Sequence, residues 1–162
     1  QNVYDHSVHV PLIFAGPGIP QNERREAFVY LLDIFPTLCD LLGIEIPDTV
    51  EGKSLIPALK NPSEPIRQYL HFAYEGLHRG VRDQRYKLIE YVVGGVHVKT
   101  QLFDLEDDPR ETTNLADDPR YAETLVRLRR ELRRGWLEDY GDTQEQGQSF
   151  WKAFDASVGE MR

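Results

Sequence analysis

The sequence predicts the closing part of an α/β layer, followed by an α+β subdomain in which an antiparallel sheet packs on one long helix. Three patterns predict this class. Residues 8–15 form a nearly continuous apolar run, which is typical of a strand buried on both faces of a parallel sheet. From residue 69 onwards apolar and polar residues alternate, as they do along strands with one buried face. Between Tyr121 and Trp136 apolar residues recur every three or four positions, as on the buried face of a helix.

The α/β segment contains one well-marked helix over residues 34–42. Asp33 suits the N-cap position, and Pro36 falls in the first turn, where a missing N–H group does no harm. Gly43 can adopt the left-handed conformation that ends many helices. The apolar residues between these signals lie on one stripe, so we expect the helix to pack on a sheet. A short helical turn is expected over residues 52–60.

Strands in the subdomain are predicted from the alternation of residues and from the turn residues between the runs. They cover residues 69–74, 80–82, 86–92 and 96–105. Gly94-Gly95 separates the last pair, and two glycines accept the positive φ angles of a tight hairpin turn without steric cost. The long helix is expected to begin at Asp117 or Asp118, with Pro119 at its first position.

The chain is predicted to have three parts, with a boundary at the proline-rich residues 61–65, which are typical of a linker. Residues 1–60 supply the last strand and helix of the α/β domain. Residues 61–141 form the sheet-and-helix subdomain. Residues 142–162 form a C-terminal tail that is polar at first and then carries an aromatic group.

Composition limits the class of protein. The chain has 162 residues and a formal net charge of −8. Nucleic-acid binders gain most of their affinity by neutralising phosphates with Lys and Arg, so this charge argues against a nucleic-acid partner. No apolar run approaches the roughly 18 residues that span a membrane. The chain begins with Gln1 and its only methionine is Met161, so we expect a processed, truncated or partial chain, and the compartment stays open.

Cationic residues cluster at the start of the predicted hairpin. His78 and Arg79 are followed by Arg82, Arg85 and Lys87. Such residues commonly form a solvated sheet face that is paired with neighbouring carboxylates. Alternatively they face an anion, since Arg binds sulfate, phosphate or carboxylate through two parallel hydrogen bonds. Spacing alone favours the solvated face.

Other segments resemble sites only superficially. Asp5, His6 and Ser7 are residue types of a catalytic triad, but consecutive residues of an extended chain point apart. The acid-rich residues 102–116 lack the central glycine and closing glutamate of an EF-hand, so we predict a structural turn there in preference to a metal site. Cys39 lies among leucines and is expected to be buried and inert.

Several motifs occur in a definite order along the chain. They occupy residues 3–13 with the Gly16-Pro17-Gly18 turn, residues 32–43 with Asp33-x-x-Pro36-Thr37-Leu38, and residues 51–55, 79–89 and 102–116. Together they resemble the C-terminal portion of the type I sulfatase family, which belongs to the alkaline phosphatase superfamily. The resemblance runs from residue 1 to about residue 137. His9 departs from it, because the family usually has arginine before Val-Pro.

The resemblance implies an alkaline-phosphatase-like α/β fold followed by a small subdomain of four antiparallel strands and one long helix. It also implies hydrolysis of sulfate esters by a formylglycine nucleophile beside a calcium ion. In the family these centres lie upstream, with the active-site lysine directly before the position of Gln1. Cys39 lacks the Cys-x-Pro-x-Arg context of a formylglycine precursor. We therefore assign no catalytic residue and no metal ligand to this chain, and we expect calcium to be bound elsewhere in the parent protein.

The leading hypothesis is a C-terminal part of a sulfatase that completes the fold and part of the substrate pocket but is inactive alone. His78 and Arg79, on a subdomain loop, are the candidates for substrate contact. The expected partners are the N-terminal catalytic part of the same protein and a sulfated small molecule or glycan. Two alternatives stay open: a phosphonate monoester hydrolase or phosphodiesterase of the same superfamily, and a non-catalytic module that binds sulfated glycans.

Overall fold

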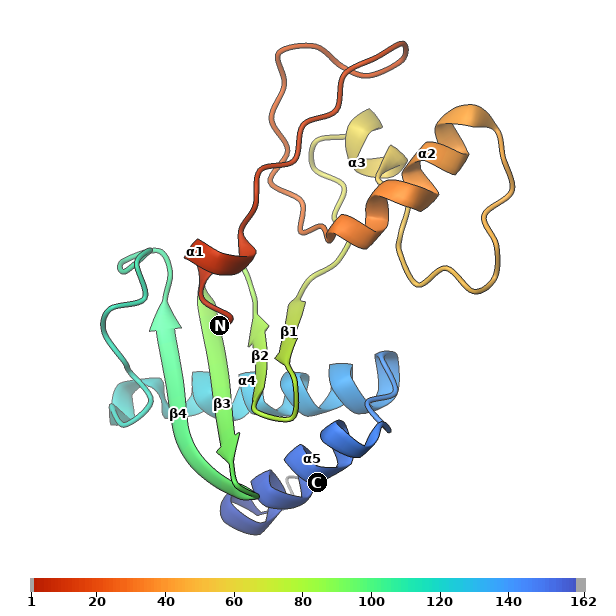
Figure 1. The fold of residues 1–162 in the computed structure, drawn as a ribbon. Coiled ribbons are helices and arrows are strands. Elements are labelled where there is room, and N and C mark those ends of the chain that lie inside the picture. Colours follow the sequence, from red (N-terminus) through yellow and green to blue (C-terminus); the bar gives the residue numbers. More distant parts are fainter. Residues whose placement is uncertain (1, 160–162) are drawn as a thin grey trace. The chain divides into compact units, whose positions relative to one another are not determined.

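The computed structural model describes residues 2–159, and the chain divides into two compact units (Figure 1). Unit 1 comprises Gln1–Val10 together with His71–Arg162, and unit 2 comprises Pro11–Leu70. The first ten residues therefore belong to the same unit as the distant sheet, not to the loop that follows them. The division into domains at residues 1–60, 61–141 and 142–162 stays a prediction.

Unit 1 is built on a four-stranded sheet with the order β1-β2-β3-β4. The strands are β1 (Leu70–Tyr74), β2 (His78–Arg82), β3 (Tyr86–Val93) and β4 (Val96–Asp104). β2 pairs antiparallel with β3, and β3 pairs antiparallel with β4. In the turn between β3 and β4, Gly94 and Gly95 have φ angles of 59° and 74°, the positive values that the sequence predicts. The antiparallel four-stranded sheet is confirmed.

The predicted long helix is α4 (Ala122–Arg134), which contacts β2 and β3. A short 3-10 turn at Pro119–Tyr121 precedes it, and the Asp118 carboxylate accepts a hydrogen bond from the N–H group of Arg120. Leu128 and Leu132 of α4 are fully buried. The predicted apolar stripe therefore faces the sheet, and the helix start lies where Asp118 and Pro119 indicate.

α5 (Glu145–Val158) lies in the region for which the sequence predicts only a tail, and it contacts β3 and β4 (Figure 1). Phe150, Trp151 and Phe154 are buried on one side of this helix. The residues of its first turn are polar, so apolar residues do not recur at helical spacing along its whole length and the sequence pattern does not indicate a helix. α5 extends the cover that α4 gives to the sheet.

Unit 2 is organised around α2 (Ile34–Leu42), which coincides with the predicted helix. It begins after Asp33 and ends at Gly43, whose φ angle of 67° is left-handed as predicted. α3 (Ile56–Lys60) supplies the short helical turn expected near this place. The glycine signal for the C-terminal end of α2 is therefore confirmed. The capping predicted for Asp33 is wrong: Asp33 ends a 3-10 turn (Leu31–Asp33) and makes no side-chain cap hydrogen bond to α2, because its carboxylate is bonded to Arg67 and to the N–H groups of Tyr30 and Lys53.

The strand predicted at residues 8–15 is wrong. Asp5–Val8 form a single helical turn, α1, and residues 9–15 take part in no strand pairing. A strand is stable only where a neighbouring strand satisfies its backbone N–H and C=O groups. Within residues 2–159 no strand runs beside this segment, so its apolar sequence does not produce a ladder.

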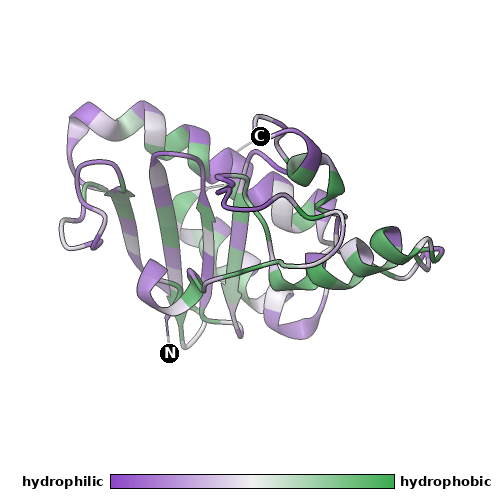
Figure 2. Ribbon diagram, turned by 90° about the horizontal axis from the view of Figure 1, so that it is seen from above, coloured by the Kyte–Doolittle hydropathy of each residue, from purple (hydrophilic) through white to green (hydrophobic). Residues whose placement is uncertain are grey.

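Unit 2 exposes large apolar side chains along α2 and at both of its ends. They are Leu31, Leu32, Phe35, Leu38, Leu41, Leu42 and Ile44. In Figure 2 this helix carries hydrophobic colours along most of its length. A helix that is apolar on several sides is typical of the interior of a larger protein. Within the described part of the chain, no helix has both the length and the apolar character needed to cross a membrane.

Candidate functional site

The sheet of unit 1 has two chemically different faces, because successive side chains of a strand point to opposite sides. Glu90 of β3 bonds to Arg129 of α4, so its side of the sheet is the helix face. Lys87 of β3 bonds to Asp5 of α1 and lies on the opposite side, which we call the outer face. The N-terminal residues of the described chain therefore lie against the outer face.

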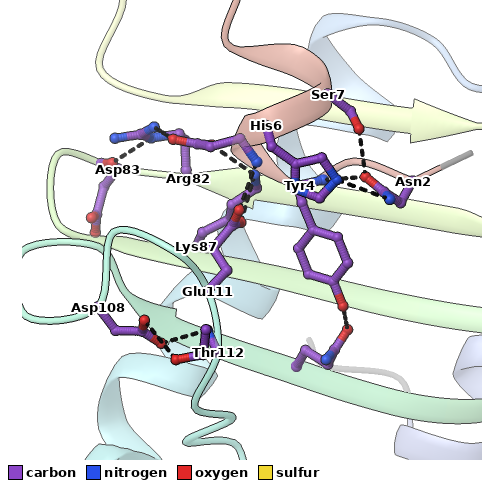
Figure 3. A network of polar contacts seen from close by, with 12 residues as sticks. Asn2, Tyr4, His6, Ser7, Arg82, Asp83, Lys87, Asp108, Glu111 and Thr112 are labelled. Carbon is purple, nitrogen blue, oxygen red and sulfur yellow. Dashed lines mark hydrogen bonds and ion pairs between the residues drawn. The ribbon is translucent and has the colours of Figure 1, made fainter.

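A cluster of charged side chains holds α1 on the outer face (Figure 3). The Lys87 side chain is fully buried, and its Nζ lies 2.8 Å from both Asp5 Oδ1 and Glu111 Oε1. Arg82 Nη1 donates a hydrogen bond to Asp5 Oδ2 at 2.8 Å. The backbone N–H of Asp5 donates to Glu111 Oε2 at 2.6 Å. The formal charges cancel, so the cluster is neutral while it joins α1, β2, β3 and the turn after β4.

The neighbouring cations of this cluster lower the pKa of the Asp5 carboxyl. Burial acts to raise its pKa, but the hydrogen bond and charge of Lys87, together with the charge of Arg82, hold the pKa below its ordinary value of 3.8. Asp5 is therefore ionised at neutral pH. Because its pKa is lower in the folded state, its contribution to stability is present above about pH 4 and is lost as the pH falls further.

The acid-rich segment after β4 forms a turn whose polar side chains Asp104, Asp108 and Asn114 are bonded to neighbouring groups. Asp104 receives hydrogen bonds from Arg85 Nε at 2.9 Å and Nη2 at 2.7 Å. Asp108 accepts from two backbone N–H groups of the turn. Glu111 adopts a φ angle of 56°, which is uncommon outside glycine, and Asn114 bonds to backbone groups of β4. These residues therefore stabilise the turn that places Glu111 beside Lys87.

His78 lies on the outer face within a group of tyrosines. Its ring centroid is 4.4 Å from that of Tyr91 and 5.6 Å from that of Tyr74. The Tyr91 hydroxyl lies 3.5 Å from the Tyr4 hydroxyl, which donates to Gln101 at 2.7 Å. His78 Nδ1 is buried without a hydrogen-bond partner among the described residues, and burial lowers the pKa of the ring. His78 is therefore a neutral imidazole at neutral pH with unused hydrogen-bonding capacity.

Arg79 lies on the helix face, where its donors are occupied. Its guanidinium donates to both carboxylate oxygens of Asp142, from Nε at 2.8 Å and from Nη2 at 3.1 Å. The same group lies over the rings of Trp136 and Phe150 and is almost completely buried. The structure therefore places His78 and Arg79 on opposite faces of β2, and their contact with substrate stays a prediction.

A buried carboxylate organises unit 2. The Asp33 side chain is fully buried and receives hydrogen bonds from Arg67 Nη1 at 2.5 Å and Nη2 at 2.9 Å. It also accepts from the N–H groups of Tyr30 at 2.6 Å and Lys53 at 2.8 Å. Gly52 is required beside it, since a Cβ atom there would lie 2.2 Å from the backbone oxygen of Leu32. Two of the sequence motifs thus meet at Asp33.

A further network on the helix face has no local signal in the sequence. The Glu90 carboxylate is fully buried and lies 2.7 Å from His97 Nε2. Thr100 Oγ1 donates to it at 2.6 Å, and Arg129 Nε donates at 2.7 Å. The sequence does show that Glu90 is a charged residue within an apolar strand, and a buried charge requires a partner. The network ties α4 to the middle of the sheet.

No assembled metal centre occurs in the part of the chain that the structure describes, where no group of three or more His, Cys, Asp or Glu side chains is placed to hold an ion. Cys39 is a free, buried thiol. Calcium in the parent protein, bound by residues outside this chain, stays a prediction.

Comparison with known sequences assigns a family to most of the chain. The family model described as N-sulphoglucosamine sulphohydrolase, C-terminal, matches residues 1–136. A Delta 4,5-hexuronate-2-O-sulfatase of Bacteroides thetaiotaomicron is 37% identical over 148 residues, which are 85% of this chain and 29% of that protein. The chain thus spans less than a third of the length of this relative.

Solved structures give the same result for the fold. A 2-O GAG sulfatase has a TM-score of 0.60 and 36% identity, and the match covers 79% of this chain and 30% of that one. A structure in complex with its substrate D-glucosamine-2-N,6-O-disulfate has a TM-score of 0.59 and 28% identity, covering 70% of this chain and 25% of that one. The predicted class, the C-terminal portion of an alkaline-phosphatase-like protein with an α+β subdomain, is confirmed.

Proposed function

The chain belongs to the C-terminal family of the N-sulphoglucosamine sulphohydrolases, within the type I sulfatases, and from this premise we propose that its parent protein hydrolyses sulfate esters of sugars. In this proposal the chain completes the fold and forms one wall of the substrate pocket. The nucleophile and the calcium ligands belong to the remainder of the parent protein.

The observation that carries the proposal is the identity to sulfatases over most of the chain. The hexuronate sulfatase and the 2-O GAG sulfatase are 37% and 36% identical to it, and a third neighbour holds a sulfated glucosamine as its substrate. Each of these descriptions refers to a sulfated sugar or a glycosaminoglycan. This supports a sulfated sugar as the substrate class in preference to a phosphonate monoester.

The exposed apolar surface of unit 2 supports the need for a further part of the protein. Phe35, Leu38 and Leu42 of α2 are exposed, although side chains of this kind are normally buried when a helix belongs to a larger core. We propose that the remainder of the parent protein covers this helix. Contact with that remainder would also supply the strand neighbours that the apolar residues 9–15 lack here.

His78 is the residue of this chain that we propose to contact the sugar. It lies beside tyrosines on the outer face, and its ring is neutral and incompletely bonded. Arg79 supports the same strand from the opposite face, where its guanidinium is held by Asp142. Arg79 would therefore position β2, while His78 would offer a hydrogen bond to the substrate from Nε2, since Nδ1 is buried.

The test is a comparison of substrates with purified parent protein, wild type and His78→Ala. We expect sulfate release from a 2-O-sulfated hexuronate disaccharide and no hydrolysis of a phenyl phosphonate monoester. His78→Ala should raise KM by about tenfold, because one hydrogen bond to the substrate is worth about 1–2 kcal/mol. His9→Ala, which changes an exposed histidine outside the tyrosine group, should leave KM unchanged.

Other outcomes would contradict the proposal in distinct ways. Hydrolysis of the phosphonate ester without release of sulfate would identify a phosphonate monoester hydrolase. Binding of the sulfated disaccharide without any hydrolysis would identify a non-catalytic module. An unchanged KM in His78→Ala, with sulfate release intact, would remove His78 from the substrate pocket but leave the sulfatase activity in place.

A further inference from the structure

Lys99 lies on the outer face because β4 contains a bulge. Tyr91 pairs with Lys99, whereas Val92 pairs with His97, so Val98 is an extra residue without a partner in β3. In a regular strand residues 97 and 99 would share one face. The bulge instead turns His97 to the helix face and leaves Lys99 opposite Tyr91. Bulges of this kind re-aim a side chain and are frequent beside active sites.

The surroundings of Lys99 are aromatic and adjoin His78. Lys99 Nζ lies 5.9 Å from the centre of the Tyr91 ring, and Tyr91 packs against His78, which packs against Tyr74. Tyrosine rings present an apolar surface with a polar edge. A cation above such a surface suits a ligand that is apolar on one side and anionic at its rim, and an acidic sugar has this character.

Lys99 also differs from the other Lys and Arg residues of the strands and of the β2–β3 turn, each of which has a carboxylate partner. These pairs are Arg79 with Asp142, Arg82 with Asp5, Arg85 with Asp104, and Lys87 with Asp5 and Glu111. Between residues 2 and 159 no carboxylate lies within ion-pair distance of Lys99, whose side chain is exposed. Among the described Lys and Arg residues of the strands, Lys99 is therefore the one whose charged group can receive an anion from outside.

We propose that Lys99 is a specificity residue of the parent enzyme, whose ammonium group binds a second anionic group of the sugar, distinct from the sulfate that is hydrolysed. That second anion is a carboxylate or another sulfate. The proposal rests on the proposed function, because it concerns the same substrate and the same outer face. It adds that the enzyme discriminates between sugars by charge and that Lys99 makes the discrimination.

The experiment uses the parent protein with Lys99→Ala, Lys99→Arg and the control Lys152→Ala, which removes an exposed lysine of α5. One substrate pair is a 2-O-sulfated hexuronate disaccharide and its carboxyl-reduced analogue. A second pair differs only in the presence of an N-sulfate. Lys99→Ala should raise KM by about three- to tenfold for the member that carries the second anion, since a charge-assisted hydrogen bond is lost. In the pair whose members differ in the anion that Lys99 binds, KM for the other member should stay unchanged.

The pair that loses its discrimination identifies the anion as carboxylate or sulfate. Lys99→Arg should retain the discrimination, and Lys152→Ala should behave as wild type. An equal change of KM for both members of both pairs, or no change for any, would overturn the proposal.

The proposal has a readout that does not depend on turnover. Calorimetric titration of the parent protein with the same disaccharides should show weaker binding of the doubly anionic member in Lys99→Ala. If no sulfate ester is hydrolysed but this difference in binding is found, the proposed function fails and the role of Lys99 stands. Equal binding by wild type and Lys99→Ala would overturn the role of Lys99 whatever the activity.

Discussion

Replacement of Asp33 by asparagine should lower the free energy of unfolding of unit 2 by about 3–5 kcal/mol, because Arg67 would keep a charge that is buried without a carboxylate. Both side chains of this pair are nearly inaccessible to water. The N–H groups of Tyr30 and Lys53 would also lose an ionised acceptor. Hydrogen exchange at these two amides in the parent protein measures the effect, and both should exchange much faster in Asp33→Asn.

The same substitution has a characteristic pH dependence. Burial acts to raise the pKa of Asp33, but hydrogen bonds from Arg67 and from the N–H groups of Lys53 and Tyr30 hold it below its ordinary value of 3.8. The unfolded chain therefore takes up a proton first as the pH falls, and the stabilisation is present above about pH 4 and is lost below it. The difference between wild type and Asp33→Asn should narrow in that acidic range.

Asp40→Asn provides the control for this prediction, because it makes the same chemical change at an exposed position of the adjoining helix α2. Its unfolding free energy should match that of wild type. Equal stability of Asp33→Asn and Asp40→Asn at neutral pH would show that the buried pair with Arg67 does not hold unit 2 together.

Replacement of Lys87 by methionine should destabilise unit 1 by about 3–5 kcal/mol at neutral pH, since it leaves buried carboxylates without their shared cation. Methionine has a similar length and can occupy the space beside Phe72, so the loss of charge dominates over the loss of volume. Asp5 keeps Arg82 as a partner, whereas Glu111 loses its ion pair with Lys87. Urea denaturation of the parent protein measures the change.

If the loss of charge causes the destabilisation of Lys87→Met, two further results are expected. A buried carboxylate without a cation has a raised pKa, so the folded variant binds a proton more readily than its unfolded form. The destabilisation of Lys87→Met should therefore be smaller at about pH 5 than at about pH 8. Adding Glu111→Gln should recover part of the lost stability, and Lys152→Met should have no effect. A loss that is independent of pH, and is not reduced by Glu111→Gln, would assign the effect to packing instead of charge.

Those parts of the fold that depend on neighbouring residues could be predicted from the sequence. α2 ends at Gly43, and the β3–β4 turn lies at Gly94-Gly95, because positive φ angles are a property of a few adjacent residues. The strand prediction at residues 8–15 is wrong because it depends on residues far away in the sequence. Whether an apolar run forms a strand is decided by a distant neighbour, and the described chain offers none.

The site was less predictable than the fold. Asp5 and Lys87 are separated by 82 positions, and no local pattern indicates that they bond. The bulge at Val98 moves Lys99 to the outer face, although alternation alone would place it with His97. His78 and Arg79 are neighbours in sequence, yet the pleat of β2 directs Arg79 to Asp142 on the helix face. Long-range pairing and one irregular residue therefore decide which side chains can meet a ligand.

The central claim is that this chain works only as part of a larger catalytic protein. Release of sulfate from a 2-O-sulfated hexuronate disaccharide tests it most directly, with the 162-residue chain alone, the remainder of the parent alone, and the two co-expressed. We expect sulfate release only when both parts are present. Release of sulfate by the 162-residue chain alone, at the rate of the intact parent protein, would contradict the account.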